Sequence, residues 1–424
     1  MLPMAFACDT ACAADLVHLL SPAKMPSQQN LAMLGMQVFV ALWIFVLGSC
    51  FGSFLNVVIY RMPAGLSLGK PKSRCPRCET SLAAKDNIPV LGWLMLKGKC
   101  RYCSLPIAAR YPIIEATCGL VFLGLMFGEL LIGAANLPVR PPDTFHINPG
   151  FWLVWFAKWD LSGIFFFHCC LLVVVLATVM IGFDGHKPQP KLMAFAIIVA
   201  LVCGTMWPDL HAVSAAGWPE SLSRLQTGFI WQDFMQPPNR LWTGVTLLGF
   251  LDGLAGIAGG LVFGTLVSYA ASSSSSTSVN PDQRNVLPAT LQAAFVIVGG
   301  FLGWQASGMM AVLMLPVIVV LKLTPKCCPG LSVHRIVGPV FFLMLFAFIL
   351  TWEKLDSATW MIGISGWQFG GFVWWQDWLA TIVVIAVVAA LLHQLSPGEL
   401  AEEERELVKL GPQIDNTSPN TTES

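Results

Sequence analysis

Long apolar runs separated by short polar stretches dominate this sequence and limit what it can fold into. The runs lie near the ~20 residues that a helix needs to cross a bilayer. Only 11% of the 424 residues are charged and 55% are hydrophobic, whereas a soluble domain carries roughly 25% charged residues. Because backbone polar groups inside a bilayer must be satisfied within each segment, we predict an all-α polytopic membrane protein.

The apolar runs predict about eight or nine transmembrane helices. The candidate spans cover residues 36–60, 112–134, 163–183, 191–207, 243–271, 289–304, 308–323, 337–352 and 378–393. The sixth and seventh are short, and the stretch from Gly303 to Gly308 interrupts them.

The spans divide the chain into five segments. The first and last lie outside the bilayer, as an extracytoplasmic N-terminal segment and a polar, turn-rich cytoplasmic tail whose composition predicts disorder. Between them we expect a first pair of spans joined by a cysteine-rich loop, a membrane bundle and additional C-terminal helices. In chain order the five segments are 1–35, 36–134, 135–323, 324–394 and 395–424.

Basic residues set the expected orientation. The loop from Arg61 to Arg110 holds ten of the chain's 24 Lys and Arg residues against two acids. Short loops rich in Lys and Arg remain on the cytoplasmic side. The loop is therefore expected in the cytoplasm, and threading the spans from it places the C-terminal tail on the same side.

The same loop carries four cysteines in two Cys-x2-Cys pairs separated by 21 residues, at Cys75, Cys78, Cys100 and Cys103. This spacing is typical of a tetrahedral zinc site, and a site with four protein ligands is structural. Nearby basic residues would offset the charge of four thiolates: Lys72, Arg74, Arg77, Lys99 and Arg101. Reduced free thiols and a redox pair of Cys-x-x-Cys motifs are the alternatives, although disulfides are rare in the cytoplasm.

Three stretches around these cysteines carry a family resemblance. They are GSFLNVVIYRMP (52–63), DNIPVLGWLMLKGKCRYC (86–103) and PIAARYPIIEATCG (106–119). Together they resemble the N-terminal region of the type IV prepilin leader peptidase/N-methyltransferase family. The resemblance implies a multi-pass enzyme of the bacterial inner membrane, acting on prepilins or pseudopilins of type IV pilus and type II secretion systems at the cytoplasmic face. It would cut after the leader glycine and methylate the new N-terminus with S-adenosylmethionine. Its partners would be these substrates and the lipid bilayer, and no nucleic acid is expected.

Five residues match the family signature by position. An ion pair at the end of a helix is the alternative to a functional role for Arg110 and for Glu115, which lie near the cytoplasmic end of a predicted span. The five are Asn56, Arg110, Tyr111, Pro112 and Glu115.

The family's proteolysis uses two aspartates at cytoplasmic helix ends, a carboxylate pair whose pKa values are split so that one activates water. The first acid corresponds to the stretch TVMIGFDGHKPQPKL (178–192), but Gly182 stands at its position. Asp184 aligns with the second acid of that stretch, or with the first if the register slips. It is the candidate catalytic residue, because acids at a membrane boundary are often functional. A solvent-exposed carboxylate at a helix end is the alternative.

The second acid should lie in a Gly-x-Gly-Asp motif upstream of GGFLGWQ (299–305). The family register places Thr290, Leu291 and Ala293 at the Gly, Asp and Lys positions, and the chain contains no Gly-x-Gly-Asp. Asp282, in the linker before this span, is the nearest carboxylate, but it lies nine residues upstream of position 291, too far for a simple shift of the alignment. A carboxylate pair cannot operate with one member, so we expect impaired proteolysis.

These observations leave three hypotheses. The leading one is a leader peptidase/N-methyltransferase-like membrane protein that processes or binds prepilins or pseudopilins with a degenerate aspartyl dyad. The second is a catalytically inactive protein that docks pilins or assembly factors. A transporter is less favoured, because acids in or beside the spans are few and no repeated broken-helix pattern is present.

Overall fold

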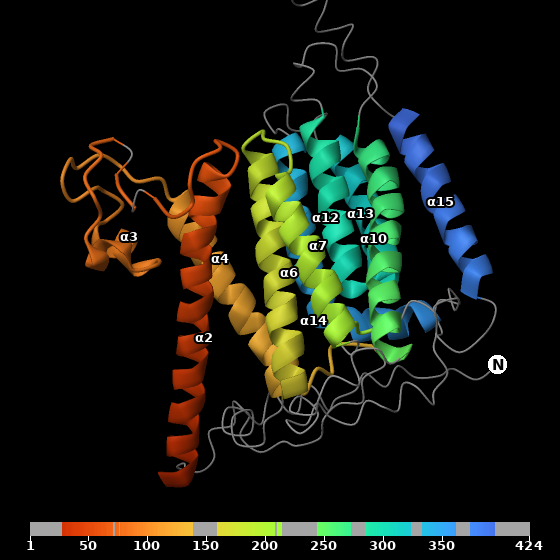
Figure 1. Cartoon of the computed structure of the whole chain (residues 1–424), viewed down its shortest axis with the longest axis horizontal. Helices are drawn as coiled ribbons and strands as arrows, with labels where there is room; N and C mark the ends of the chain where they lie inside the picture. The colour runs from red at the N-terminus through yellow and green to blue at the C-terminus, as the bar shows by residue number, and fades with distance from the viewer. Residues whose placement is uncertain are drawn as a thin grey trace, which may run out of the picture.

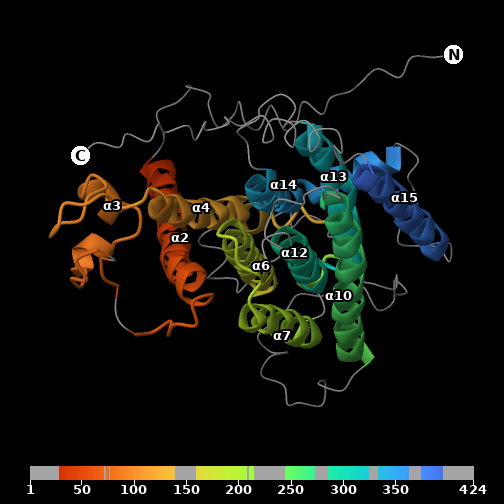
Figure 2. The same ribbon diagram turned by 90° about the horizontal axis from the view of Figure 1, so that it is seen from above.

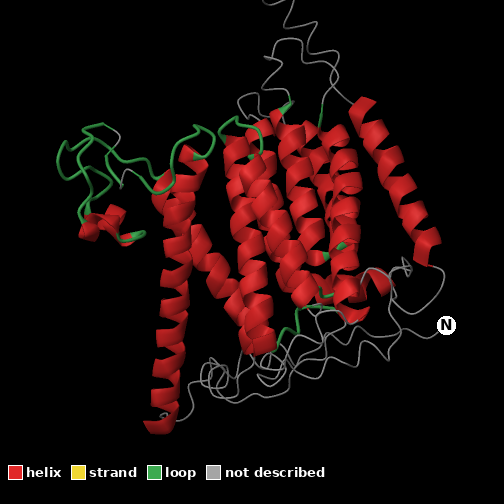
Figure 3. Ribbon diagram, viewed as in Figure 1, coloured by secondary structure: helices red, strands yellow, loops and turns green. Residues whose placement is uncertain are grey.

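The computed structural model describes residues 28–70, 73–75, 77–138, 159–207, 210–213, 244–272, 285–323, 333–361 and 374–394. Over these residues the chain is helical, and extended pairing is limited to two isolated bridges in the cysteine-rich loop (Figure 3). The all-α fold predicted from the sequence is confirmed. The predictions for residues 1–27 and for the tail 395–424 lie outside the described residues.

The helices agree closely with the predicted spans. They are α2 (Gln28–Arg61), α4 (Arg110–Leu125), α6 (Trp159–Phe183), α7 (Pro190–Met206), α10 (Gly244–Ala271), α12 (Val286–Leu302), α13 (Trp304–Leu323), α14 (Val333–Met361) and α15 (Trp374–Gln394), with the short η1 (Ala84–Asn87), α3 (Leu91–Met95) and π-helical η2 (Met126–Leu131). Within the described residues, five apolar helices are long enough to cross a membrane: Leu34–Arg61, Arg110–Leu131, Leu161–Phe183, Gly249–Ala271 and Ile336–Leu355. Helices α7, α12, α13 and α15 contribute shorter apolar segments.

The helices alternate in direction, and one end of the bundle carries the cysteine-rich loop (Figure 1). At this end Arg110 at the start of α4 contacts Asp184 just after α6. The Ser268 hydroxyl near the end of α10 donates to the carbonyl of Pro288 at the start of α12. Tyr269 of α10 stacks on His393 at the end of α15. These contacts fit the predicted threading, in which the same helix ends share one side of the membrane.

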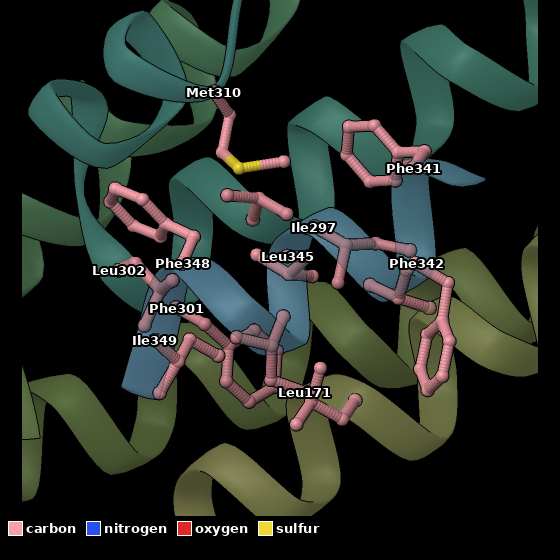
Figure 4. Packing of buried hydrophobic residues seen from close by; sticks show 14 of the residues in the cluster. Leu171, Ile297, Phe301, Leu302, Met310, Phe341, Phe342, Leu345, Phe348 and Ile349 are labelled. Atoms are coloured by element: carbon pink, nitrogen blue, oxygen red, sulfur yellow. The ribbon is translucent and has the colours of Figure 1, made fainter. Parts of the chain in front are cut away.

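The core of the bundle lies between α6, α12, α13 and α14. Aromatic and branched side chains from these helices meet there (Figure 4), and the hydrophobic cluster continues into α4. The labelled members of the cluster are Leu171, Ile297, Phe301, Leu302, Met310, Phe341, Phe342, Leu345, Phe348 and Ile349.

Helices α10 and α12 approach each other with their backbones in contact. A Cβ atom built on Gly256 would overlap the carbonyl oxygen of Gly299, and one built on Gly299 would overlap the carbonyl of Gly256. Small residues let membrane helices pack this closely. Gly303, with φ of +92°, separates α12 from α13, so the interruption predicted between the sixth and seventh spans falls at one residue.

Candidate functional site

The four cysteines of the loop converge on one point. Their Sγ atoms all lie within 4.8 Å of one another, and those of Cys75 and Cys103 are 3.9 Å apart. Four sulfurs bound to one zinc at ~2.3 Å in a tetrahedron are about 3.8 Å apart. All four thiols are free. The donor set and its spacing therefore fit a tetrathiolate metal site.

Both Cys-x-x-Cys pairs lie on the same type of turn. In the first, the Cys75 N–H donates to Thr80 and the Glu79 N–H donates back to Cys75. In the second, the Cys100 N–H donates to Leu105 and that of Ser104 donates back to Cys100. Glu79 and Ser104 hold matching positive φ values of 55° and 58°. The repeated turn presents the cysteine pairs as two equivalent knuckles.

Hydrogen bonds within the first knuckle favour a thiolate at Cys78. The hydroxyl and the backbone N–H of Thr80 lower the pKa of the Cys78 thiol to about 6. Backbone N–H groups of Cys103 and Tyr102 also lower the pKa of Cys100. Because metals bind the thiolate form, these hydrogen bonds favour the ligand state of Cys78 and Cys100, whereas burial and the neighbouring thiols raise the pKa of Cys103 to about 11.

A salt bridge fixes the second knuckle to the rest of the loop. Arg101, between two of the cysteines, donates to Asp86 from Nε at 2.8 Å and from Nη2 at 2.5 Å. The Asp86 side chain is only 1% exposed, and the Arg101 guanidinium lowers the pKa of this carboxyl. The sequence assigned Arg101 to offsetting thiolate charge, but its guanidinium is engaged by Asp86.

The signature residues attach the loop to the membrane helices. The Asn56 side-chain amide donates to the Tyr111 carbonyl at 3.2 Å, which joins α2 to α4. The Glu115 carboxylate accepts the backbone N–H of Val90 at 2.7 Å. Val90 has a φ of +62°, a strained value for a β-branched residue. Glu115 therefore holds the start of α3 and makes no ion pair with Arg110, the alternative that the sequence left open.

Arg110 instead binds Asp184, the candidate catalytic residue. Two parallel hydrogen bonds of 2.5 and 2.7 Å join its guanidinium to the two carboxylate oxygens. The Asp184 side chain is 25% exposed and that of Arg110 is 36% exposed. The pair links the start of α4 to the turn after α6, and both carboxylate oxygens face a guanidinium.

The two segments that should carry the aspartyl dyad lie side by side. Gly182 in the last turn of α6 packs against Thr290 in α12, and a Cβ at Gly182 would overlap the Thr290 side chain. Thr290 is 2% exposed and the adjacent Leu291 is 1% exposed. The family register therefore points to two helices that are in contact, but Gly182 and Thr290 form that contact and Leu291 follows Thr290 in α12.

One buried polar pair was not identified as a site from the sequence. Glu129 in η2 and His168 in α6 are both 0% exposed, with Oε1 and Nδ1 2.5 Å apart. Their other polar atoms, Glu129 Oε2 and His168 Nε2, are buried with no hydrogen-bond partner among the described residues. The only sequence signal for this pair is one ionisable residue at a similar depth in each of two apolar runs. The sequence could not show that these two runs are neighbours.

Comparisons with known proteins find matches in the N-terminal part of the chain. The family model of the Bacterial Peptidase A24 N-terminal domain matches residues 46–128. Residues 46–128 belong to this family. The segment holds the cysteine quartet and Glu115, so the resemblance inferred from the sequence is confirmed for it.

Curated relatives show the same segment. A prepilin leader peptidase/N-methyltransferase of Myxococcus xanthus is 52% identical over 86 residues, which cover 20% of this chain and 26% of that protein. A Klebsiella pneumoniae protein of the same name is 46% identical over 87 residues, covering 19% and 38%. One from Pectobacterium carotovorum is 39% identical over 129 residues, covering 24% and 46%. The chain thus spans less than half the length of these relatives. No solved structure matches the chain.

Proposed function

We propose that this chain is a leader peptidase/N-methyltransferase-like protein of the bacterial inner membrane that binds type IV prepilins or pseudopilins at its cytoplasmic face without cutting them. The N-terminal family segment and the named activities of its relatives support the substrate class. The basic composition of the loop supports a cytoplasmic location for it.

The contact between Gly182 and Thr290 is the observation on which the loss of proteolysis rests. Aspartyl chemistry needs one carboxylate to hold a proton while the other activates water. At the corresponding positions Gly182 has no side chain, and Leu291 can neither hold a proton nor polarise water. Asp184 is the nearest acid in the register, and both its oxygens already bind Arg110. Loss of a group that acts as part of a catalytic unit removes most of the rate.

We further propose that the cysteine quartet binds one structural zinc ion. Cys75, Cys78, Cys100 and Cys103 would hold it, and its role would be to fold a loop too small to have its own hydrophobic core. No residue of the described chain is assigned to S-adenosylmethionine, which the family resemblance implies. Methyl transfer acts on the amine that the cut creates, so no methylation step is assigned to this chain.

Co-expression with a prepilin from the same cell tests the proposal. The prepilin is expected to co-purify with this chain and to keep its leader, as read by mass spectrometry of its N-terminus. Leader removal that disappears in Asp184→Ala would contradict the loss of proteolysis and would establish the catalytic role predicted for Asp184.

A gain-of-function variant makes the test sharper. Gly182→Asp and Leu291→Asp restore both acids of the family register, and Thr290→Gly removes the side chain that obstructs position 182. We expect leader removal by the triple variant. The matched control keeps Thr290 and carries only the two aspartates, and it should cut more slowly because Thr290 occupies the space that the first aspartate needs.

A further inference from the structure

The cysteine-rich loop presents an apolar edge formed by α3 and by Ile88 just before it. Ile88 is 43% exposed, Leu91 and Leu94 are each 55% exposed, and Met95 is 58% exposed. Trp93 points the other way and donates from its indole N–H to the carbonyl of Ile107 at 3.0 Å. The short helix is therefore two-sided, with Trp93 anchoring it to the loop and four large apolar side chains turned outward.

Contacts with the spanning helices fix the level of this edge. The Val90 N–H, at the start of α3, binds Glu115, which lies five residues inside α4, or about 7 Å at 1.5 Å per residue. The Cα of Glu115 packs against Gly52, nine residues before α2 ends at Arg61, or about 13 Å along the helix. Helix α3 thus lies beside the flank of the spanning helices rather than beyond their ends.

The figures agree with this placement. In Figure 1, α3 lies lower than the end of α2 and close to its side. Figure 2 shows α3 at the outer edge of the molecule, next to α2 and α4 and away from the rest of the bundle. Near Gly52 and Glu115, α2 and α4 carry exposed apolar residues of their own, among them Phe54 at 55% and Ile113 at 61% exposed.

The surroundings of the edge match a membrane interface. Tyr60, near the end of α2, is 67% exposed, and Tyr111, at the start of α4, is 41% exposed. Tyrosine is enriched where helices leave the bilayer. Lys97 and Lys99 follow α3 directly and are exposed, as expected for side chains that extend toward lipid phosphates.

We propose that α3 is an interfacial membrane anchor of the cysteine-rich loop. Ile88, Leu91, Leu94 and Met95 insert into the lipid leaflet beside α2 and α4, and the basic residues after α3 contact anionic headgroups. Lipid is the occupant because the edge continues the lipid-facing surface of α2 and α4 and lies at their depth. Glu115 acts as a positioning residue that holds α3 at this level through Val90.

Site-specific fluorescence tests the anchor. A fluorescent amino acid that reports polarity is incorporated at Leu94 of the full chain in nanodiscs containing phosphatidylglycerol. We expect lipids that carry a quenching label to quench it roughly threefold more strongly than aqueous iodide does, as for a side chain at the acyl boundary. The matched control carries the same label at Glu79, whose side chain is 74% exposed, and should show the opposite preference.

The remaining outcomes also decide the proposal. Equal iodide quenching at positions 94 and 79 would overturn it. Protection of the Leu94 label that appears only when a prepilin is added would also overturn it, because the edge would then be a protein-docking surface. The label placed at Met95 provides a second position, and the zinc content of each variant shows whether the loop is folded. Prepilin cleavage is not part of the readout, so the result is independent of the proposed function.

Discussion

At the scale of single residues, the Arg110–Asp184 pair ties two distant parts of the chain together. Removing either member should lower the free energy of unfolding by roughly 0.5–1 kcal/mol, because both side chains are partly exposed and water screens the pair. Once Asp184→Asn is present, Arg110→Ala should cost little more, since the paired partner is already lost. Thermal unfolding of both single variants and the double variant measures this. Fully additive losses would show that the two side chains act independently.

The buried Glu129–His168 pair should behave differently, because it lies in the apolar core. His168→Leu alone leaves a buried carboxyl without its partner and should destabilise the protein by about 3 kcal/mol. Replacing both residues by apolar ones, Glu129→Leu with His168→Phe, should recover most of that loss, since no uncompensated polar group remains. The unfolding midpoint in detergent measures both variants. If the double variant is as unstable as His168→Leu alone, the interaction between the two side chains itself contributes net stability.

At the scale of elements, backbone contact between α10 and α12 predicts a strong effect of one methyl group. Gly299→Ala should cost roughly 1–3 kcal/mol, because its Cβ would overlap the Gly256 carbonyl and the two helices would have to separate. Gly35→Ala in α2 is the matched control, since nothing lies within 4 Å of its added Cβ. It should be neutral or stabilising, because alanine favours a helix over glycine. Comparable destabilisation by both variants would contradict the contact.

Within the cysteine-rich loop, the Asp86–Arg101 salt bridge should govern how tightly the proposed zinc ion is held. Asp86→Asn should speed zinc loss to a chelator roughly tenfold, as changes next to metal ligands commonly do. Arg101 lowers the pKa of Asp86, so the pair stabilises the loop above the usual carboxyl range and loses this effect as pH falls through the lowered pKa. Stopped-flow zinc release with a colorimetric chelator provides the measurement. Unchanged release would limit Asp86 to a role in folding.

Sequence patterns predicted some of these elements well and others not at all. Apolar runs located the helices, because span length is set by bilayer thickness, and the spacing of the cysteines predicted their convergence, because two-residue turns bring thiolates together. The family register, which aligns Leu291 with the second aspartate, assigned the two acid positions to α6 and α12. These two helices are in contact. The Glu115–Val90 bond and the outward face of α3 depend on which segments become neighbours. That information is not contained in any local pattern.

At the scale of the whole molecule, two parts rely on different sources of stability. The bundle has a continuous hydrophobic core across α4, α6, α12 and α14, whereas the loop would depend on the proposed metal ion at the cysteine quartet and on a few hydrogen bonds. Apolar burial supports the bundle at roughly 25 cal/mol per Å², and metal binding supplies the folding free energy of a small metal-bound loop. Zinc removal should therefore unfold the loop and leave the bundle intact.

Limited trypsin digestion of the zinc-loaded chain, with and without a chelator, checks this expectation. Chelation, or the Cys75→Ser variant, should make trypsin cut after Lys97 and Lys99, because the turn between α3 and the second knuckle loses its anchor and becomes flexible enough to enter the protease active site. Circular dichroism should retain most of its helical signal, since the helices outside the loop keep their core. Cys50→Ser is the matched control, because Cys50 is exposed on α2 and lies outside the quartet. Collapse of the helical signal on chelation would mean that the metal supports the bundle as well as the loop.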